Sequence, residues 1–280
     1  QITDGAQLAK IAKDVENGTV YKDAYFRLEN DIDLSAHRWN PIGVYKCYEG
    51  GATEDRMFAG FLDGNGKTIT GLIVDERTEK NRAGLFGKIT CIGTATNVGV
   101  KDLNIVDARI YATNEGMKSS SSAILAGMVM TNPGDTVRFD DISVSGTIVN
   151  TRVGDNSMIS GGLFGEANRV TADHCRADVT IEGGDNTGGF VGLDGSSTYR
   201  NCKVTGKVTG LWSIGGFVGY AGEAESTTMS TFDNCIAKVA VIASNWRAGG
   251  FAGYMEKGKS SSCAALGDVT SSVTGFDPIV

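Results

Sequence analysis

A short pattern of glycines and apolar residues returns along most of this chain. It reads Ala-Gly-Leu-Phe-Gly at 83–87, Gly-Gly-Leu-Phe-Gly at 161–165, Gly-Gly-Phe-Val-Gly at 188–192 and 215–219, and Gly-Gly-Phe-Ala-Gly at 249–253. The closest copies lie 27 residues apart, and the longer intervals carry insertions. A repeat of this length is typical of solenoids. We expect its glycines to be structural: Gly84, Gly87, Gly162, Gly165, Gly189, Gly192, Gly216, Gly219, Gly250 and Gly253.

A second repeated string follows each of the later glycine motifs by about thirteen residues. In this string a cysteine, a small apolar residue and a valine or glycine alternate with Arg, Lys, Asp and Thr. Period-two alternation predicts a strand with one buried face. A third short strand is expected at 179–181 and at 207–209. Each unit therefore reads as three short strands joined by Gly, Asn and Ser turns.

Units that stack in one orientation must pair their strands in parallel, so the repeat predicts an all-β chain wound as a parallel β-helix. A β-propeller is disfavoured because a blade needs four strands and about 40 residues; an antiparallel sandwich is the other alternative. Residues 4–17 predict a helix, with Asp4 and Gln7 as its capping box and Gly18 as its stop. We expect one domain over 1–280, comprising a cap helix (1–20), N-terminal layers (21–82) and repeat layers (83–280).

Composition excludes several classes of function. The net charge is −7 and no run of Lys or Arg stands out, which argues against binding to nucleic acid or to an anionic membrane. No apolar stretch reaches the roughly 18–20 residues of a membrane span. His37 and His174 are the only histidines, which leaves little material for histidine catalysis or a zinc site. We therefore expect no cofactor, no metal and no catalytic residues.

Several segments resemble the GLUG-motif proteins, named for a repeated Gly-Leu-apolar-Gly unit. The resemblance rests on the glycine repeat and on LENDIDLS (28–35), WNPIG (39–43) and FLDGNGKTITGL (61–72). The repeat region also resembles the non-catalytic N-terminal region of bacterial immunoglobulin-A metallopeptidases. These resemblances imply a right-handed parallel β-helix on a bacterial cell surface, of adhesin-like character. The His-Glu-x-x-His motif of those peptidases does not occur in this chain, so their activity is not carried over.

The repeated cysteines share one inward-facing position in successive units. A stack of small apolar side chains explains them better than a metal site or a disulfide ladder, because side-by-side Cβ vectors suit disulfide geometry poorly. A bond between Cys47 and Cys91, which lie outside this column, is left open. The column residues are Cys175, Cys202, Cys235 and Cys263.

Aromatic residues offer the best candidate ligand site. Trp212 and Trp246 each precede a motif glycine by four residues, and Tyr220 and Tyr254 each follow the same glycine by four. Residues at the same position in successive units of a solenoid lie above one another, so the sequence predicts a stacked Trp pair and a stacked Tyr pair. Such rings either bind sugars or cover turns and the end of the coil. Tyr45 and Tyr48, in the insertion at 44–56, are a further candidate.

Three functions remain open. The first is an extracellular or cell-surface binding module that recognises a glycan or a host-surface protein, its signal peptide or anchor having been removed. The second is a polysaccharide lyase or glycoside hydrolase on the same coil, although Asp140-Asp141 is the only adjacent acidic pair in the repeats. The third is a structural spacer in a larger surface protein. The oligomeric state and the lateral face that binds are not predicted.

Overall fold

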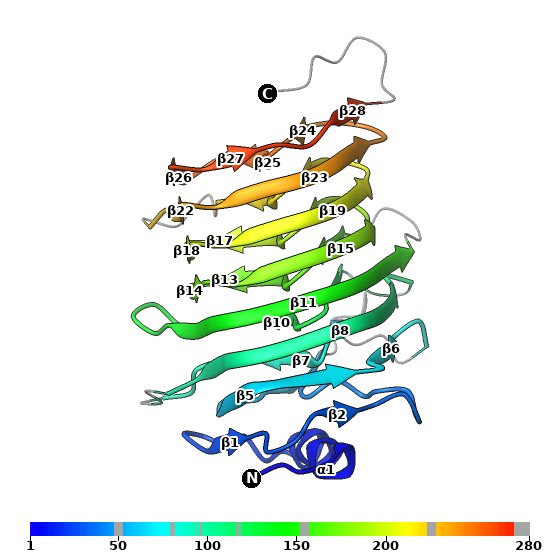
Figure 1. Cartoon of the computed structure of the whole chain (residues 1–280), viewed down its shortest axis with the longest axis vertical. Coiled ribbons are helices and arrows are strands. Elements are labelled where there is room, and N and C mark those ends of the chain that lie inside the picture. The colour runs from blue at the N-terminus through cyan, green and yellow to red at the C-terminus, as the bar shows by residue number, and fades with distance from the viewer. Residues whose placement is uncertain are drawn as a thin grey trace.

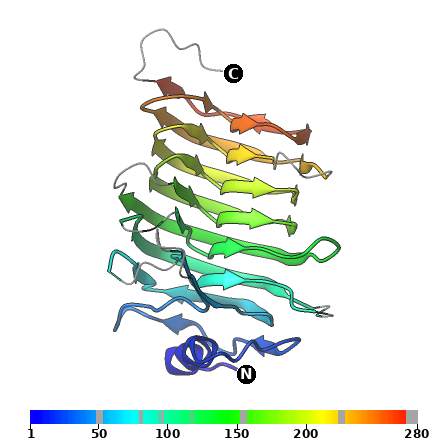
Figure 2. The same cartoon turned by 180° about the vertical axis from the view of Figure 1, so that it is seen from behind.

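The chain forms a right-handed parallel β-helix, as predicted. The computed structural model describes residues 1–47, 53–78, 82–93, 95, 97–115, 117, 119–151, 157–222 and 228–271. In Figure 1 the strands of the front face run from left to right while the chain climbs from the N-terminus at the bottom, which makes the coil right-handed. Figure 2 shows the same succession of layers from behind, where a layer is one turn of the coil.

Three parallel sheets form the walls of the coil. The fifteen-stranded sheet contains β1 (Tyr25–Arg27), β2 (Ile32–Asp33), β5 (Phe61–Thr70), β6 (Ile73–Asp75), β8 (Gly99–Thr113), β11 (Val137–Thr151), β14 (Val170–Asp173), β15 (Arg176–Glu182), β18 (Thr198–Arg200), β19 (Lys203–Gly210), β22 (Ser230–Asp233), β23 (Ile236–Ala243), β26 (Gly258–Ser261), β27 (Ala264–Ala265) and β28 (Val269–Ser271). The six-stranded sheet contains β7 (Phe86–Ile89), β10 (Ala126–Val129), β13 (Phe164–Asn168), β17 (Val191–Gly195), β21 (Val218–Ala221) and β25 (Ala252–Met255). The five-stranded sheet contains β9 (Ser119–Ser122), β12 (Ser157–Gly161), β16 (Asn186–Gly188), β20 (Ser213–Gly215) and β24 (Ala248–Gly249). An antiparallel hairpin of β3 (Val44–Cys47) and β4 (Thr53–Arg56) stands outside these walls.

A repeat layer has four strands, one more than the sequence pattern predicts. The layer that begins at β13 continues through β14, β15 and β16, and β17 then pairs with β13. The predicted cysteine strand and third strand are one continuous strand, β15. The corner between β14 and β15 is turned by His174, whose φ is 53°, and Asn201 takes the same position one layer on with a φ of 52°. Short polar side chains tolerate this left-handed conformation, which explains the Asn-Cys pairs of the repeat.

The glycine motif forms the sharp corner between the five-stranded and six-stranded sheets. A Cβ atom on Gly188 would lie 2.1 Å from the carbonyl oxygen of Val191. A Cβ on Gly189 would lie 2.3 Å from the carbonyl oxygen of Gly216 in the next layer. A Cβ on Gly192 would lie 2.7 Å from the carbonyl oxygen of Ser160. Each motif position therefore brings backbone segments closer together than any side chain permits.

The interior of the coil is filled by side chains stacked from layer to layer. The rings of Phe190 and Phe217 stack with centroids 4.6 Å apart, and Phe217 and Phe251 continue the stack at 5.0 Å. Tyr199 and Phe232 form a second stack at 5.2 Å. Because in-register layers place like residues above one another, one repeated apolar position produces a continuous column of the core.

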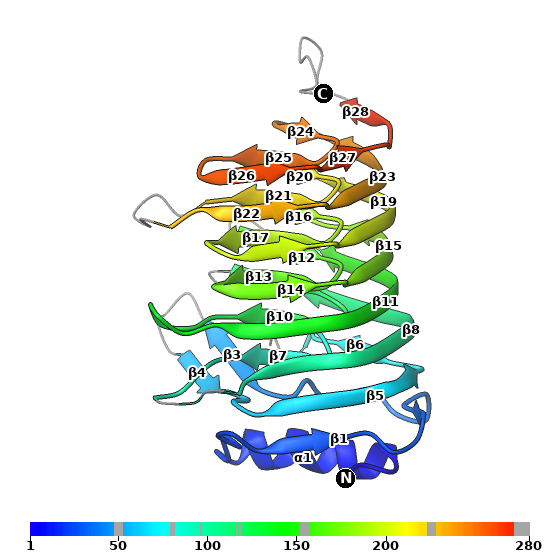
Figure 3. The ribbon, with the colours of Figure 1, turned by 60° about the vertical axis from the view of Figure 1, so that its left-hand side comes forward.

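Helix α1 (Gly5–Glu16) closes the N-terminal end of the coil, as Figure 3 shows. The Asp4 side chain accepts a hydrogen bond from the backbone N–H of Gln7 at 2.9 Å. The Gln7 side chain accepts from the backbone of Thr3, one residue before the position that a capping box predicts. The predicted cap helix is confirmed, and it buries one apolar face against the first layer. Its buried residues are Leu8, Ile11, Ala12 and Val15.

Candidate functional site

The two predicted tryptophans are neighbours on the outside of the coil. Trp212 lies between β19 and β20, and Trp246 lies at the equivalent corner of the next layer, between β23 and β24. Their side chains are 40% and 55% exposed, and the ring centroids are 5.8 Å apart. The backbone N–H of Trp246 donates to the carbonyl of Leu211, which fixes the two corners one layer apart. Two large aromatic faces are thus presented to solvent at a set spacing.

The two predicted tyrosines form a second pair on the six-stranded sheet. Tyr220 on β21 is in register with Tyr254 on β25, and their ring centroids are 5.2 Å apart. The hydroxyl of Tyr220 donates to the carboxylate of Glu256. Burial, followed by the hydrogen bond to Glu256, raises the pKa of Tyr220 to about 12. The Tyr220 hydroxyl therefore stays protonated at neutral pH.

Arg247 connects the two aromatic pairs. It follows Trp246 directly in the chain, and its guanidinium carbon lies 3.9 Å from the centre of the Tyr254 ring. This distance is a close cation–π contact. We call the set formed by Trp212, Trp246, Arg247, Tyr220, Tyr254 and Glu256 the C-terminal aromatic patch. It combines apolar ring faces with a cation and a carboxylate, the groups that protein surfaces use to hold sugar rings and their hydroxyls.

Tyr45 does not join this patch. Its ring on β3 lies over the ammonium of Lys88 at 4.6 Å and over the guanidinium of Arg82 at 5.2 Å. Lys88 is also paired with Asp55 on β4 at 2.7 Å. Lys88 is four strands away from Tyr220 in the six-stranded sheet, a separation of about 19 Å at the usual strand spacing. Tyr45 therefore helps to hold the β3–β4 hairpin on the coil, and Tyr48 lies outside the described residues.

The repeated cysteines lie in one column at the corner before β15, β19, β23 and β27. All four are free thiols, and the last one is less deeply buried than the others. The Sγ atom of Cys202 lies 3.1 Å from the carbonyl oxygen of Arg200, within the reach of a thiol hydrogen bond. Burial raises the pKa of Cys202 well above its usual range. Such thiols are poor nucleophiles and poor metal ligands, which agrees with a packing role. Cys91 is also a free buried thiol, whereas the side chain of Cys47 lies outside the described residues.

An acidic cluster forms where the acidic pair Asp140-Asp141, named in the sequence analysis, lies beside a third carboxylate on the fifteen-stranded sheet that was not predicted. Asp140 is in register with Asp173 of the next layer, and Asp173 contacts the Nδ1 atom of His174 at 2.9 Å. Burial, together with the charges of Asp173 and Asp141, raises the pKa of Asp140. Asp140 and Asp173 each lie two residues before the apolar position of the second string, Ile142 or Cys175, so their equal phase is a signal that could have found this contact. Within the described residues, no group of three or more His, Cys, Asp or Glu side chains is placed to hold a metal ion.

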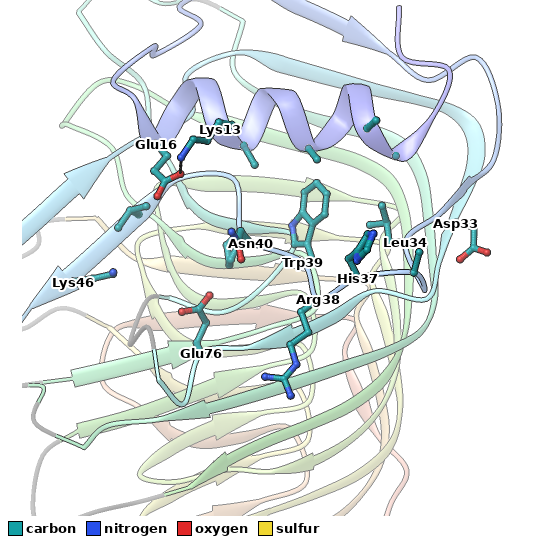
Figure 4. A pocket seen from close by; sticks show the side chains of 17 residues that line it. Lys13, Glu16, Asp33, Leu34, His37, Arg38, Trp39, Asn40, Lys46 and Glu76 are labelled. Carbon is teal, nitrogen blue, oxygen red and sulfur yellow. Dashed lines mark hydrogen bonds and ion pairs between the residues drawn. The ribbon is translucent and has the colours of Figure 1, made fainter.

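A groove between α1 and residues 33–41 was also not predicted. Its volume is about 570 Å³, and Figure 4 shows the helix above Trp39, with Arg38, Asn40 and Glu76 on the opposite side. Trp39 itself is buried, and its indole N–H donates to the carbonyl of Leu85 at 3.0 Å. These contacts give Trp39 a packing role. His37 is exposed at the rim of the groove.

Comparison with known structures places the chain in the class of parallel β-helix repeat proteins. It superposes on the crystal structure of a putative immunoglobulin A1 protease from Bacteroides ovatus with a TM-score of 0.65, over 96% of this chain and 76% of that one. The two sequences are 17% identical, so the similarity shows the fold alone. The shared fold agrees with the resemblance to the immunoglobulin-A metallopeptidases noted above.

Among curated proteins, the chain is similar to halomucin from Haloquadratum walsbyi. The two are 29% identical over 168 residues, which cover 58% of this chain and 2% of halomucin. No family model matches the chain, and the GLUG resemblance stays a prediction. No helix within the described residues has the length and apolar character needed to cross a membrane.

Proposed function

We propose that this chain is a non-catalytic surface-protein module that binds glycans through the C-terminal aromatic patch. The observation that carries the proposal is the exposed, in-register pair of Trp212 and Trp246. Exposed aromatic rings on a solenoid wall offer flat apolar faces to sugar C–H groups. The proposal places the chain outside the cell or on its surface, and the likeness to halomucin supports a surface role.

A binding screen tests this function. The soluble chain is applied to a glycan array and to immobilised mucin, together with the double variant Trp212→Ala/Trp246→Ala. We expect the double variant to lose at least about tenfold in affinity, because most of the exposed stacking area disappears. Tyr25→Ala is the matched control, since Tyr25 is an exposed aromatic stacked on Phe61 at the other end of the coil.

The outcomes separate the proposed functions. Equal binding by the wild type and the double variant would remove the patch from recognition. If the wild type binds no glycan, the glycan proposal fails, and immobilised host-surface proteins become the next ligands to test. A chain that binds neither class is best explained as a spacer.

A carbohydrate-active enzyme is the second candidate, and the acidic cluster favours it. Asp140 has a raised pKa and lies beside a second carboxyl group, Asp173, so Asp140 could act as a proton donor in a pair of carboxyl groups. If the cluster cleaves polysaccharides, Asp140→Asn should lower the rate at least about a hundredfold. The measurement is reducing-sugar release from a panel of polysaccharides, with Asp178→Asn on the neighbouring strand as the control. If the wild type releases no reducing sugar, the enzyme proposal fails and binding remains the proposed function.

A further inference from the structure

We infer that the C-terminal aromatic patch selects acidic glycans, and that Arg247 binds the carboxylate of the sugar. This inference rests on the proposed glycan-binding function and names the class of glycan. It follows from the one cation of the patch, which lies over the Tyr254 ring and directly follows Trp246 in the chain.

Within the described part of the chain, Arg247 is held by an aromatic ring and not by an ion pair. Among the described residues its guanidinium has no hydrogen-bond or ion-pair partner, and its recorded contact is the face of Tyr254. Arg77 and Arg82 differ in this respect, since Arg77 lies 2.7 Å from Asp75 and Arg82 lies 3.4 Å from Glu166. The neighbouring carboxylate, Glu256, accepts the hydrogen bond of Tyr220.

Stacking also orients the guanidinium. When one face of the planar group lies on an aromatic ring, its N–H donors still point outward in the plane of the group. A carboxylate can then accept two parallel hydrogen bonds from the edge of the guanidinium. The φ of Arg247 is 42°, in the left-handed region, so the corner that follows Trp246 has a defined geometry.

These groups fit the parts of an acidic sugar. The rings of Trp212 and Trp246 offer faces for the apolar side of a pyranose, and Arg247 follows Trp246 directly in the chain. A uronic or sialic acid carries its carboxylate on the ring, so ring stacking and ion pairing can occur together. A sulfate ester can also accept two hydrogen bonds from a guanidinium, so a sulfated glycan is the competing ligand that the test must separate from the uronate.

The test compares two ligands that differ only in charge. Binding of a galacturonate oligosaccharide and of its methyl ester is measured by calorimetry at low and at physiological salt. The wild type should bind the acid at least about tenfold more tightly than the ester, with a smaller preference at higher salt. Arg247→Met should abolish the preference, and Arg247→Lys should retain only part of it. Arg176→Met, which removes an exposed arginine from β15, should leave the preference unchanged.

Each outcome has one meaning. If the wild type binds acid and ester equally, the acidic-sugar inference is wrong while the glycan-binding function stands. Tighter binding of a sulfated glycan than of the uronate would also overturn the inference. If the wild type binds no glycan on the array, the proposed function fails, and the inference fails with it. The glycan-binding function is supported if the double tryptophan variant alone loses binding to the acid and to the ester. The acidic-sugar inference is supported if Arg247→Met loses the preference for the acid.

Discussion

Asp194 is a fully buried carboxyl group inside the coil. It accepts hydrogen bonds from the hydroxyl of Tyr199 at 2.6 Å, from the hydroxyl of Ser230, and from the backbone N–H of Ser197 at 3.4 Å. These bonds favour the ionised form, but burial disfavours it more strongly and raises the pKa of Asp194. The folded protein therefore binds a proton at Asp194 more readily than the unfolded chain does.

This difference predicts a pH-dependent stability. Because the pKa of Asp194 is higher in the folded state, protonation of this group stabilises the fold. The stabilisation is complete at pH values below the unfolded pKa, near 3.9, and it is lost as the pH rises through the folded pKa. Lowering the pH from 7 towards 5 should therefore stabilise the wild type relative to Asp194→Asn, with a slope of at most about 1.4 kcal/mol per pH unit at pH values below the folded pKa. Urea unfolding at both pH values measures this difference.

Asp33→Asn is the control for Asp194→Asn. A hydrogen bond from the Ser35 backbone lowers the pKa of Asp33, which is exposed, so its stabilising effect is lost only below about pH 4 and Asp33→Asn should keep the wild-type slope between pH 7 and pH 5. The same slope in both variants would contradict the assignment of the effect to Asp194.

At the scale of the element, the glycine corner limits which side chains the repeat tolerates. We expect Gly189→Ala to destabilise the coil by about 3 kcal/mol or more, because its Cβ would meet the backbone of the next layer. Gly250→Ala is the matched variant, since the nearest atom to its Cβ is the side-chain methyl of Ala265 at 2.9 Å. It should cost clearly less than Gly189→Ala. Thermal unfolding of the two variants checks the ranking, and equal losses would refute this account of the motif.

Sequence periodicity predicts the elements better than it predicts their corners. The glycine motif and the alternating string mark where strands lie, because each repeats at a fixed phase. They do not show that His174 and Asn201 turn the chain between two strands, since a corner depends on backbone angles and leaves no apolar periodicity. The strand before this corner, such as β14, was missed for this reason, and the cysteine strand and the third strand were predicted as two although β15 is continuous.

Sites whose residues share one position in the repeat could be predicted from the sequence, and sites whose residues share no repeat position could not. Trp212 and Trp246 have equal offsets from their glycines, and the structure places them together. Asp140 and Asp173 also share one position in the repeat, two residues before Ile142 and Cys175, and they pair in register, so their proximity could have been predicted in the same way. The groove beneath α1 arises from the way the helix sits on residues 33–41, which no repeat encodes.

At the scale of the whole molecule, α1 protects the first layer from association. Replacing Leu8 and Ile11 by Asp should detach the helix and expose the apolar end of the coil, so the variant should self-associate. Because each layer contacts mainly its neighbours, the C-terminal aromatic patch should keep its structure. Light scattering coupled to size-exclusion chromatography, with tryptophan fluorescence, measures both effects. Lys10→Ala, at an exposed helix position, should remain unchanged, and a monomeric double variant would contradict this role of α1.

The in-register stacking of layers also has a consequence for how such a molecule can change in length. The residues 189–215 form one layer of 27 residues, whose strands pair with equivalent strands above and below. A tandem duplication of that segment would insert a rung in which every glycine, cysteine and core ring meets its own copy. The ends of the rod would keep their structures while the distance between the groove and the aromatic patch grew by about 4.8 Å. Gene duplication could therefore adjust the reach of the molecule in discrete steps without redesigning either surface.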